Sequence, residues 1–268
     1  MKVLWVGLYS LLALLSTLFI SMFCSARRNS VKLLQMQTSS ARLSNAELNV
    51  FFISDIHRRK VSPKLLGKVK AQNKLIDLVI IGGDLAEKGV PSSRVRSNVH
   101  QLASLGPVYY IWGNNDREIG ETTIREIISE VNGAILDNKS TRIPKHPDWI
   151  LSGADDPSSG NTNLQKALSY NGEFTYQLLA VHSPSLFDKA AKIAAPDFMV
   201  AGHTHGGQIR LGPFGMQPRG TFVEKNGRGR LISNGFGTSL IPLRLGAPPE
   251  THLITINYEK KKGTEKHD

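Results

Sequence analysis

Metal-binding side chains follow five short apolar runs of this sequence, at the point where each run ends. The runs NVFFI, LVII, VYYIW, QLLAV and FMVA are followed by SDIH, GGD, GNND, a single His and GHTHGG. Taken singly, each motif is commonplace, because an Asp-x-His after a strand is most often a turn or a helix cap. Together they indicate one site assembled from several strands. The candidate metal ligands are Asp55, His57, Asp84, Asn114, His182, His203 and His205.

These candidate ligands offer only oxygen and nitrogen donors, a composition that suits Mn, Fe or Zn. Seven residues are too many for one ion, whereas two ions that share one carboxylate would use them all. We therefore expect two divalent metal ions, with manganese favoured. The chain has a single cysteine, Cys24, which excludes an internal disulfide and a zinc site built from cysteines.

The elements that must hold these ligands alternate between short apolar strands and longer amphipathic helices. Such alternation predicts an α/β protein, and the uninterrupted apolar runs are typical of strands buried on both faces. In open α/β sheets, ligands bind at the carboxyl ends of the strands, where these motifs lie. The predicted strands are residues 49–53, 78–81, 108–112, 149–152, 177–181, 198–201, 230–233 and 252–258, and the predicted helices are residues 63–74, 92–105, 121–131 and 185–194.

The motifs DIH, GGD, GNND, His182 and GHTHGG together resemble the five-block signature of the calcineurin-like metallophosphoesterase superfamily, over most of residues 50–258. The segments GHTHGGQIRLGPFG and GRGRLISNGFGTSLIPLRLGAPPE are also similar to a membrane-associated bacterial branch that includes hydrolases of UDP-2,3-diacylglucosamine. The resemblance implies a four-layer αββα sandwich. It also implies a metal-dependent phosphoesterase that acts as a phosphodiesterase or a pyrophosphatase.

The resemblance further implies how the ligands are shared between two ions. Two cations roughly 3.5–4 Å apart lower the pKa of a water that bridges them, and the resulting hydroxide attacks phosphorus in line. Both cations also hold the phosphoryl oxygens during the attack. The implied ligands are Asp55, His57 and His205 for one ion and Asn114, His182 and His203 for the other, with Asp84 bridging the two.

One position departs from the family pattern, which usually has His after the Asn of the GN block. Here that position is Asn115, and an amide donates a hydrogen bond but cannot act as a general acid near neutral pH. We expect Asn115 and Asp116 to serve catalysis beside the ligands, Asp116 by orienting a ligand or the turn. Arg58 and Arg117, next to the first and third motifs, are candidate substrate-binding residues, against the alternative of an exposed basic loop.

The N-terminal segment from Val3 to Ala26 contains no charged residue and is long enough to span a bilayer, which takes about 20 residues. We expect a single-pass transmembrane anchor over residues 1–26. A cleaved signal peptide and a lipoprotein anchor on Cys24 are the alternatives. Basic residues are more numerous after the segment than before it, so the positive-inside rule places the catalytic domain in the cytoplasm, with an extracytoplasmic location as the alternative.

The rest of the chain divides into three predicted parts: a basic juxtamembrane linker over residues 27–48, the catalytic domain over residues 49–258 and a charged tail over residues 259–268. A formal net charge of +11 suits an anionic partner. We expect a phosphate-ester or pyrophosphate substrate, including a lipid-linked one, and an anionic membrane surface. Nucleic acid is not an expected partner, because basic and aromatic residues do not alternate as in a nucleic-acid groove.

Two alternative functions stay open from the sequence. The first is a nucleotide or nucleic-acid phosphodiesterase, which the basic charge would suit. The second is a non-catalytic membrane scaffold that keeps the fold, although the presence of all seven candidate ligands argues against it.

Overall fold

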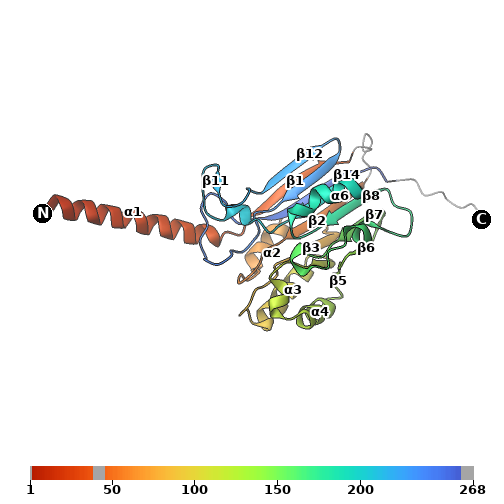
Figure 1. The fold of residues 1–268 in the computed structure, drawn as a ribbon, viewed down its shortest axis with the longest axis horizontal. Helices are drawn as coiled ribbons and strands as arrows, with labels where there is room; N and C mark the ends of the chain where they lie inside the picture. Colours follow the sequence, from red (N-terminus) through yellow and green to blue (C-terminus); the bar gives the residue numbers. More distant parts are fainter. Residues whose placement is uncertain (1, 39–45, 261–268) are drawn as a thin grey trace, which may run out of the picture.

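The computed structural model describes residues 2–38 and 46–260 and contains two six-stranded mixed sheets (Figure 1). The first sheet has the order β1 (Val31–Gln37), β14 (Thr251–Tyr258), β2 (Ala46–Ile53), β3 (Leu78–Gly82), β4 (Val108–Ile111) and β5 (Ala134–Ile135). The second has the order β12 (Thr221–Lys225), β13 (Arg228–Ile232), β9 (Phe198–Ala201), β8 (Tyr176–Ala180), β7 (His146–Gly153) and β6 (Lys139–Ile143).

Helices and turns connect these strands. The α-helices are α1 (Lys2–Ala26), α2 (Pro63–Lys70), α3 (Ser92–Ala103), α4 (Glu121–Glu130), α5 (Leu164–Leu168) and α6 (Phe187–Ile193). The short 3-10 turns are η2 (Asp116–Ile119), η3 (Pro157–Ser159), η4 (Pro184–Leu186) and η5 (His205–Gly207). A two-stranded hairpin, β10 (Arg210–Leu211) and β11 (Phe214–Gly215), follows η5.

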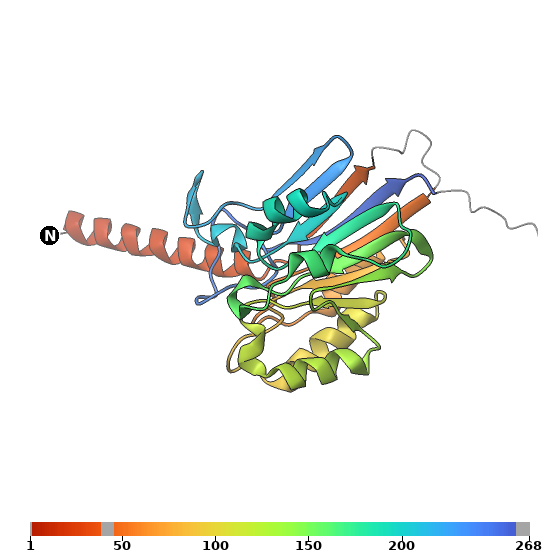
Figure 2. The same cartoon turned by 45° about the vertical axis from the view of Figure 1, so that its right-hand side comes forward.

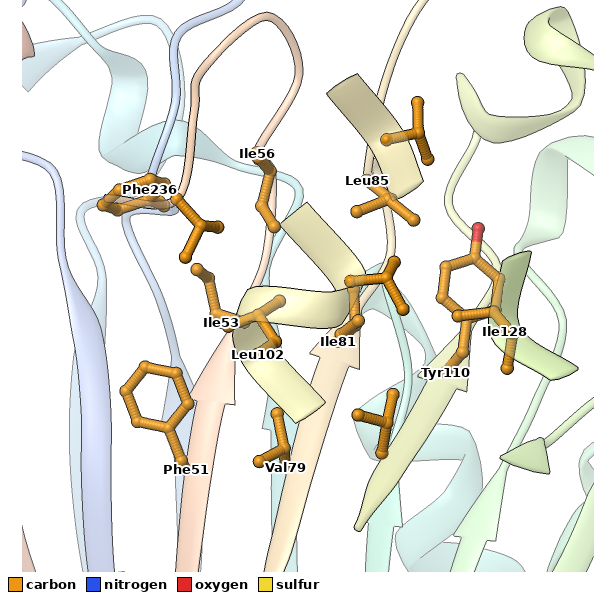
Figure 3. Close-up of a cluster of buried hydrophobic side chains, with 14 of the residues drawn as sticks. Phe51, Ile53, Ile56, Val79, Ile81, Leu85, Leu102, Tyr110, Ile128 and Phe236 are labelled. Atoms are coloured by element: carbon orange, nitrogen blue, oxygen red, sulfur yellow. The ribbon is translucent and has the colours of Figure 1, made fainter. Parts of the chain in front are cut away.

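Strands β2, β3 and β4 of the first sheet are buried on both faces, as their uninterrupted apolar runs predict. Alternate residues of β2 point to opposite sides, so that Phe51 and Ile53 pack outward on helices α2, α3 and α4, whereas Phe52 packs inward on the second sheet. Figure 3 shows the outer cluster, in which Leu102 of α3 lies over Ile53 and Ile81. Helices α5 and α6 cover the outer face of the second sheet. The layers are therefore helix, sheet, sheet and helix.

Residues 27–48, predicted as a linker, are structured in the part that the model describes. Strand β1 pairs in parallel with β14 along its whole length, so this segment belongs to the first sheet. Most of its side chains are partly or fully exposed, as at the edge of a sheet, which is why no apolar pattern marked it. Within the predicted tail, residues 261–268 lie outside the described residues.

Helix α1 leaves the molecule at the edge where the metal-binding motifs lie. Val31, at the start of β1, pairs with Thr251, and the next residue of β14, His252, pairs with Phe52 near the end of β2. The start of β1 and the end of β2 are therefore at the same edge. Both views show α1 projecting from this end as a single rod (Figures 1 and 2). By length and mean hydropathy, 2.2, the helix could be a membrane anchor or a signal sequence.

Candidate metal centre

All seven predicted ligands lie at the carboxyl ends of central strands of the two sheets. Asp55 and His57 follow β2, Asp84 follows β3 and Asn114 follows β4, while His182 follows β8, and His203 and His205 follow β9. Because the two sheets face each other, these strand ends converge on one site. The described contacts among the seven residues fall into two groups that share Asp55, and Asp84 lies near histidines of both groups.

The first group consists of Asp55, His57 and His205, whose ligand atoms all lie within 4.8 Å of one another. The Nε2 atoms of His57 and His205 face each other at 3.0 Å, and His205 Nε2 lies 3.4 Å from a carboxylate oxygen of Asp55. All three side chains are buried. Burial also lowers the pKa of His205 to about 4, so at neutral pH its ring is uncharged and can serve as a ligand.

The second group consists of Asp55, Asp84 and His182, with Asn114 and His203 beside it. His203 Nδ1 lies 3.1 Å from His182 Nε2 and 3.0 Å from Asn114 Oδ1, and His182 Nε2 lies 3.1 Å from the same amide oxygen. Asn114 and His203 are exposed, whereas the other five ligands are buried. The site therefore opens to solvent on the side of Asn114 and His203.

Asp84 lies between the two groups. Its Oδ2 atom is 3.6 Å from Nε2 of His57 and 3.4 Å from Nε2 of His182. Burial opposes its ionisation, but the charge and hydrogen bond of His182, together with His57, lower the pKa of Asp84 below its usual range. Burial likewise disfavours protonated His182, yet the Asp84 carboxylate raises the pKa of His182 to about 10. One carboxylate thus lies beside histidine nitrogens from both groups.

The outer nitrogens of two ligand rings are held by oxygen atoms, which fixes the orientation of each ring. His182 Nδ1 lies 2.9 Å from the carbonyl oxygen of Gly82, and His57 Nδ1 lies 3.0 Å from a carboxylate oxygen of Glu87. His182 therefore donates outward from Nδ1, whereas His57 Nδ1 is only in ion-pair contact with Glu87, and both rings turn Nε2 toward the site. Glu87 was not predicted from the sequence; its only signal was an acidic residue three positions after Asp84.

Five of the seven ligands adopt left-handed backbone conformations that ordinary residues avoid. The φ angles are 54° for Asp55, 50° for His57, 50° for Asp84, 71° for His203 and 50° for His205. Each costs roughly 1–3 kcal/mol, and such strain clusters at functional sites. Glycine makes the tight turns possible: Gly83 has φ +83°, and a Cβ atom there would lie 2.5 Å from His182 Nδ1.

Asn115 and Asp116 support Asp84 and its loop. The Asn115 side-chain amide donates to Asp84 Oδ2 at 2.7 Å, and its backbone N–H donates to Oδ1 at 2.9 Å. The fully buried carboxylate of Asp116 accepts backbone N–H groups of Asp84, Leu85 and Gly113, at 2.9, 2.7 and 2.7 Å. Burial and the nearby Asp84 raise the pKa of Asp116 to about 6. Asp116 thus ties the loop after β3 to the loop after β4.

A buried arginine on a distant segment holds the loop of His205. Arg244 is fully buried and donates to the carbonyl oxygen of His205 at 3.0 Å, while its Nη2 atom lies 3.2 Å from His205 Nδ1. The same guanidinium donates to the carbonyl oxygens of Asn234, Gly237 and Ala247. It therefore joins the loop after β9 to the loop after β13. From the sequence, Arg244 was noted only as one residue of the segment GRGRLISNGFGTSLIPLRLGAPPE, not as a residue of the site.

The two candidate substrate-binding arginines have different surroundings. The Arg58 side chain is 70% exposed, forms an ion pair with Glu87 and donates to the carbonyl oxygen of Lys88, so it is paired with protein groups but accessible to solvent. Arg117 donates to the buried carboxylate of Asp155 at 2.8 Å, and its guanidinium lies 4.9 Å from the centre of the Trp112 ring. The Arg117 guanidinium therefore already interacts with protein groups in this structure, unlike a cation that is available for substrate.

The donors of the site fit divalent metal ions. Two pairs of histidine nitrogens face each other at 3.0 and 3.1 Å, an arrangement that requires a proton or a cation between them. Carboxylate oxygens of Asp55 and Asp84 lie beside these pairs. The family model described as calcineurin-like phosphoesterase matches residues 48–207. The chain belongs to the calcineurin-like phosphoesterase family. The matched segment contains all seven ligands, and residues after it add β12, β13 and β14 to the two sheets.

Curated relatives cover most of the chain. An uncharacterised protein of Bacillus subtilis, YpbG, is 38% identical over 88% of this chain and 90% of its own. The phosphodiesterase YaeI of Escherichia coli is 27% identical over 79% of this chain and 83% of its own. Among solved structures, the phosphopantetheinyl hydrolase PptH of Mycobacterium tuberculosis is 13% identical with a TM-score of 0.42, covering 74% of this chain and 95% of that one.

The family match, the buried Asp and His cluster and the phosphodiesterase relative confirm the predicted class of activity. The protein is a metal-dependent phosphoesterase with an α/β fold. Asp55, His57, Asp84, His182 and His205 form its candidate binuclear metal site.

Proposed function

We propose that the protein is a membrane-anchored phosphohydrolase that cleaves a phosphodiester or pyrophosphate bond with two metal ions. The observation that carries this proposal is the position of Asp84, whose Oδ2 atom lies within 3.6 Å of one histidine from each group. A carboxylate placed in this way can be shared by two ions. One ion would be held by Asp55, His57 and His205, and the other by Asn114, His182 and His203, with Asp84 common to both.

When bound, two divalent ions supply a water nucleophile at neutral pH and stabilise the charge that develops on the phosphoryl oxygens. The side chains of the protein determine where this happens. Glu87 and the Gly82 carbonyl orient His57 and His182, and Asn115 holds Asp84. Asn114 and His203 border the open side, so the phosphate group of the substrate enters there. Arg58 is the exposed cation that would attract it.

Asn115 limits which esters this site would cleave well. Its amide donates to Asp84 and cannot give a proton to a leaving alkoxide near neutral pH. Aryl diesters and pyrophosphate linkages, whose leaving oxygens need little protonation, are therefore the favoured substrates. The similarity to the phosphodiesterase YaeI supports a diester over a monoester. The resemblance of residues 202–215 and 227–250 to UDP-2,3-diacylglucosamine hydrolases makes a lipid-linked pyrophosphate the first one to test.

We place α1 in the membrane as an uncleaved anchor. The excess of basic residues after it would put the catalytic domain in the cytoplasm. A helix of 25 residues is about 37 Å long at about 1.5 Å per residue, enough for a hydrocarbon core of about 30 Å. Its C-terminal end joins the body through hydrogen bonds, because Arg59 donates to the carbonyl oxygens of Arg27 and Arg28. Manganese is the metal that we favour.

A substrate and metal screen tests the proposed activity. The full-length protein in detergent micelles is assayed with Mn²⁺, Fe²⁺ or Zn²⁺ against phosphomonoesters, phosphodiesters, nucleotide diesters and a lipid-linked pyrophosphate. We expect metal-dependent turnover, with aryl diesters and pyrophosphates cleaved faster than alkyl monoesters. His203→Ala should abolish it, whereas His100→Ala, which removes an exposed histidine paired with Glu130 on α4, should not. Metal-independent turnover, or a preference for alkyl monoesters, would refute the proposal.

A further inference from the structure

Large apolar side chains are exposed at the end of the body from which α1 projects. They come from the β10–β11 hairpin and from the loop that follows β13, and both views place the hairpin beside the C-terminal end of α1 (Figures 1 and 2). We call these residues the apolar rim. They are Leu211, 72% exposed, Phe214, 78%, Met216, 94%, Leu240, 98%, and Ile241, 46%.

The apolar rim has a defined conformation, because its two segments are hydrogen-bonded to each other. The Gln208 side chain donates to the carbonyl oxygens of Ser239 and Ile241, at 2.9 and 3.0 Å, and accepts from the Ser239 N–H at 2.8 Å. The buried Arg210 guanidinium donates to the carbonyl oxygens of Pro213 and Gln217 across the base of the hairpin. The exposed side chains are therefore held in place from below.

The backbone of Leu240 is strained. Its φ angle is 63°, in the left-handed region that a branched aliphatic residue rarely adopts. At the same time its side chain is almost fully exposed to water. A conformation that is strained and that also leaves a leucine in water is unfavourable on both counts for a protein in solution. The conformation of Leu240 is explained if its side chain enters an apolar environment.

The apolar rim is attached both to α1 and to the metal centre. The backbone N–H of Arg244 donates to the carbonyl oxygen of Met22 in the last turns of α1, at 3.1 Å, and its guanidinium holds the loop of His205. Three exposed cations, Arg27, Arg28 and Arg58, lie on the segments that meet at this end. Apolar side chains next to basic ones are the composition of surfaces that bind anionic membranes.

We propose that the apolar rim inserts into the same bilayer leaflet from which α1 emerges and holds the metal centre at the membrane surface. The occupant of this surface is the headgroup and upper acyl region of a bilayer that contains anionic lipid. This inference rests on the proposed function in that α1 stays attached as an anchor. It adds a second membrane contact, and among the substrates of the proposed function it favours a phosphate ester or pyrophosphate carried by a membrane lipid.

The arrangement explains how such a substrate would reach the ions. His203, on the open side of the site, and the hairpin are parts of one short segment, residues 203–215. An inserted hairpin therefore holds the site opening near the headgroups, where the phosphate of a lipid lies. Each large apolar side chain that leaves water favours the inserted position by roughly 10-fold or more. The rim and α1 together restrict the orientation of the body, which a single helix alone would leave free to pivot.

Insertion can be measured on the full-length protein in vesicles of phosphatidylcholine and phosphatidylglycerol. The native cysteine is first removed by Cys24→Ser. A single cysteine is then introduced by Phe214→Cys, Leu240→Cys or Leu75→Cys, and an environment-sensitive fluorophore is attached to it. Leu75 is a matched control, because it is 69% exposed and lies before β3, at the opposite edge of the sheet. We expect blue-shifted emission and quenching by nitroxide-labelled acyl chains at positions 214 and 240, and neither at position 75. Equal, water-like emission at all three positions would overturn the proposal.

A second copy of the chain covering the rim is the other outcome to separate. In that case the blue shift at position 240 would disappear when the vesicles are enriched in lipid relative to protein, and acyl-chain quenching would be absent. Either result overturns the proposal. If the N-terminal sequence of the membrane-extracted protein begins near Arg27, the anchor of the proposed function is wrong instead, and the fluorescence at position 214 still reports on the rim.

The functional consequence is tested with Leu240→Asp and its control Leu75→Asp. Turnover is measured on a lipid-borne phosphodiester in vesicles and on a water-soluble aryl diester. For Leu240→Asp we expect about a 10-fold loss on the vesicle substrate and unchanged turnover of the soluble diester. Leu75→Asp should change neither. An equal loss on both substrates, or no loss on the vesicle substrate, would overturn the proposal, whereas absence of soluble-diester turnover in the unmodified protein would refute the proposed function.

Discussion

Arg244→Lys should destabilise the protein and weaken metal binding at the first group of ligands. The guanidinium donates to the carbonyl oxygens of His205, Asn234, Gly237 and Ala247, at 3.0, 2.7, 2.6 and 2.9 Å, and more distantly to that of Gly235, at 3.4 Å. Burial lowers the pKa of Arg244 to about 10, which still leaves it charged at pH 7. A lysine ammonium keeps the charge but carries its donors on one atom, so it cannot span the same set of acceptors.

The size of the effect follows from the acceptors that lysine leaves unpaired. If the ammonium reaches two of the four nearer carbonyl groups, the other two stay buried without a donor, at about 1–3 kcal/mol each. We therefore expect a loss of about 2–6 kcal/mol in the free energy of unfolding of the metal-free protein, measured by urea denaturation. Because His205 loses a supporting partner, metal affinity should also fall by about 10–100-fold, measured by calorimetric titration with Mn²⁺.

Arg142→Lys is the matched control for this prediction. Arg142 also donates to two carbonyl oxygens, of Pro147 and Glu173, at 2.6 and 2.8 Å, but it lies on the outer strand β6, away from the metal ligands. Its replacement should leave metal affinity unchanged. The reasoning would be refuted if Arg244→Lys kept its stability within about 0.5 kcal/mol of the unmodified protein, or if both variants lost metal affinity equally.

Four further predictions concern the site, the fold and the membrane. Glu87→Gln should lower metal affinity about 10-fold in the same titration, because a neutral amide holds the His57 ring less strongly; unchanged affinity would contradict this. Asn115→His should raise turnover of alkyl diesters at least about 10-fold and flatten the dependence of rate on leaving-group pKa; equal slopes for the two proteins would show that another group supplies the proton. Burial lowers the pKa of His252 to about 3, below its unfolded value, so stability should be complete above about pH 6.5 and fall by up to about 1.4 kcal/mol per pH unit toward pH 3; His252→Gln should reduce this slope, as urea denaturation at several pH values would show. The intact chain should resist extraction from membranes by alkaline carbonate, and a soluble product that begins near Arg27 would indicate a cleaved signal peptide.

The ligands of the site were predictable because parallel strands deliver their carboxyl ends to one edge. Each ligand follows an apolar run that is recognisable without a structure, and β2, β3, β4, β8 and β9 lie within about three residues of the predicted bounds. The supporting residues were not predictable in this way. Glu87 and Arg244 act on ligands that lie far away in sequence, and no local pattern reports such a contact.

Edge strands account for most of what the sequence did not reveal about the fold. Strands β1, β6 and β12 have one neighbour each, mix polar with apolar residues and leave most of their side chains partly or fully exposed, so neither an apolar run nor a strict alternation marks them. For β1 the decisive partner is β14, more than 200 residues later in the chain. The local composition of this segment therefore predicted a linker. In the structure, pairing with β14 makes part of it a strand.

Metal content per chain tests the central claim most directly. The unmodified protein, loaded with Mn²⁺ and freed of excess ion, should contain two ions per chain and hydrolyse an aryl phosphodiester. Asp84→Ala should lose both ions and the activity together, because its carboxylate lies beside the ligands of both groups. Asp188→Ala, which removes an exposed carboxylate on α6, should retain two ions and full turnover. Two bound ions with ordinary turnover in Asp84→Ala would contradict a shared carboxylate and the two-metal site built on it.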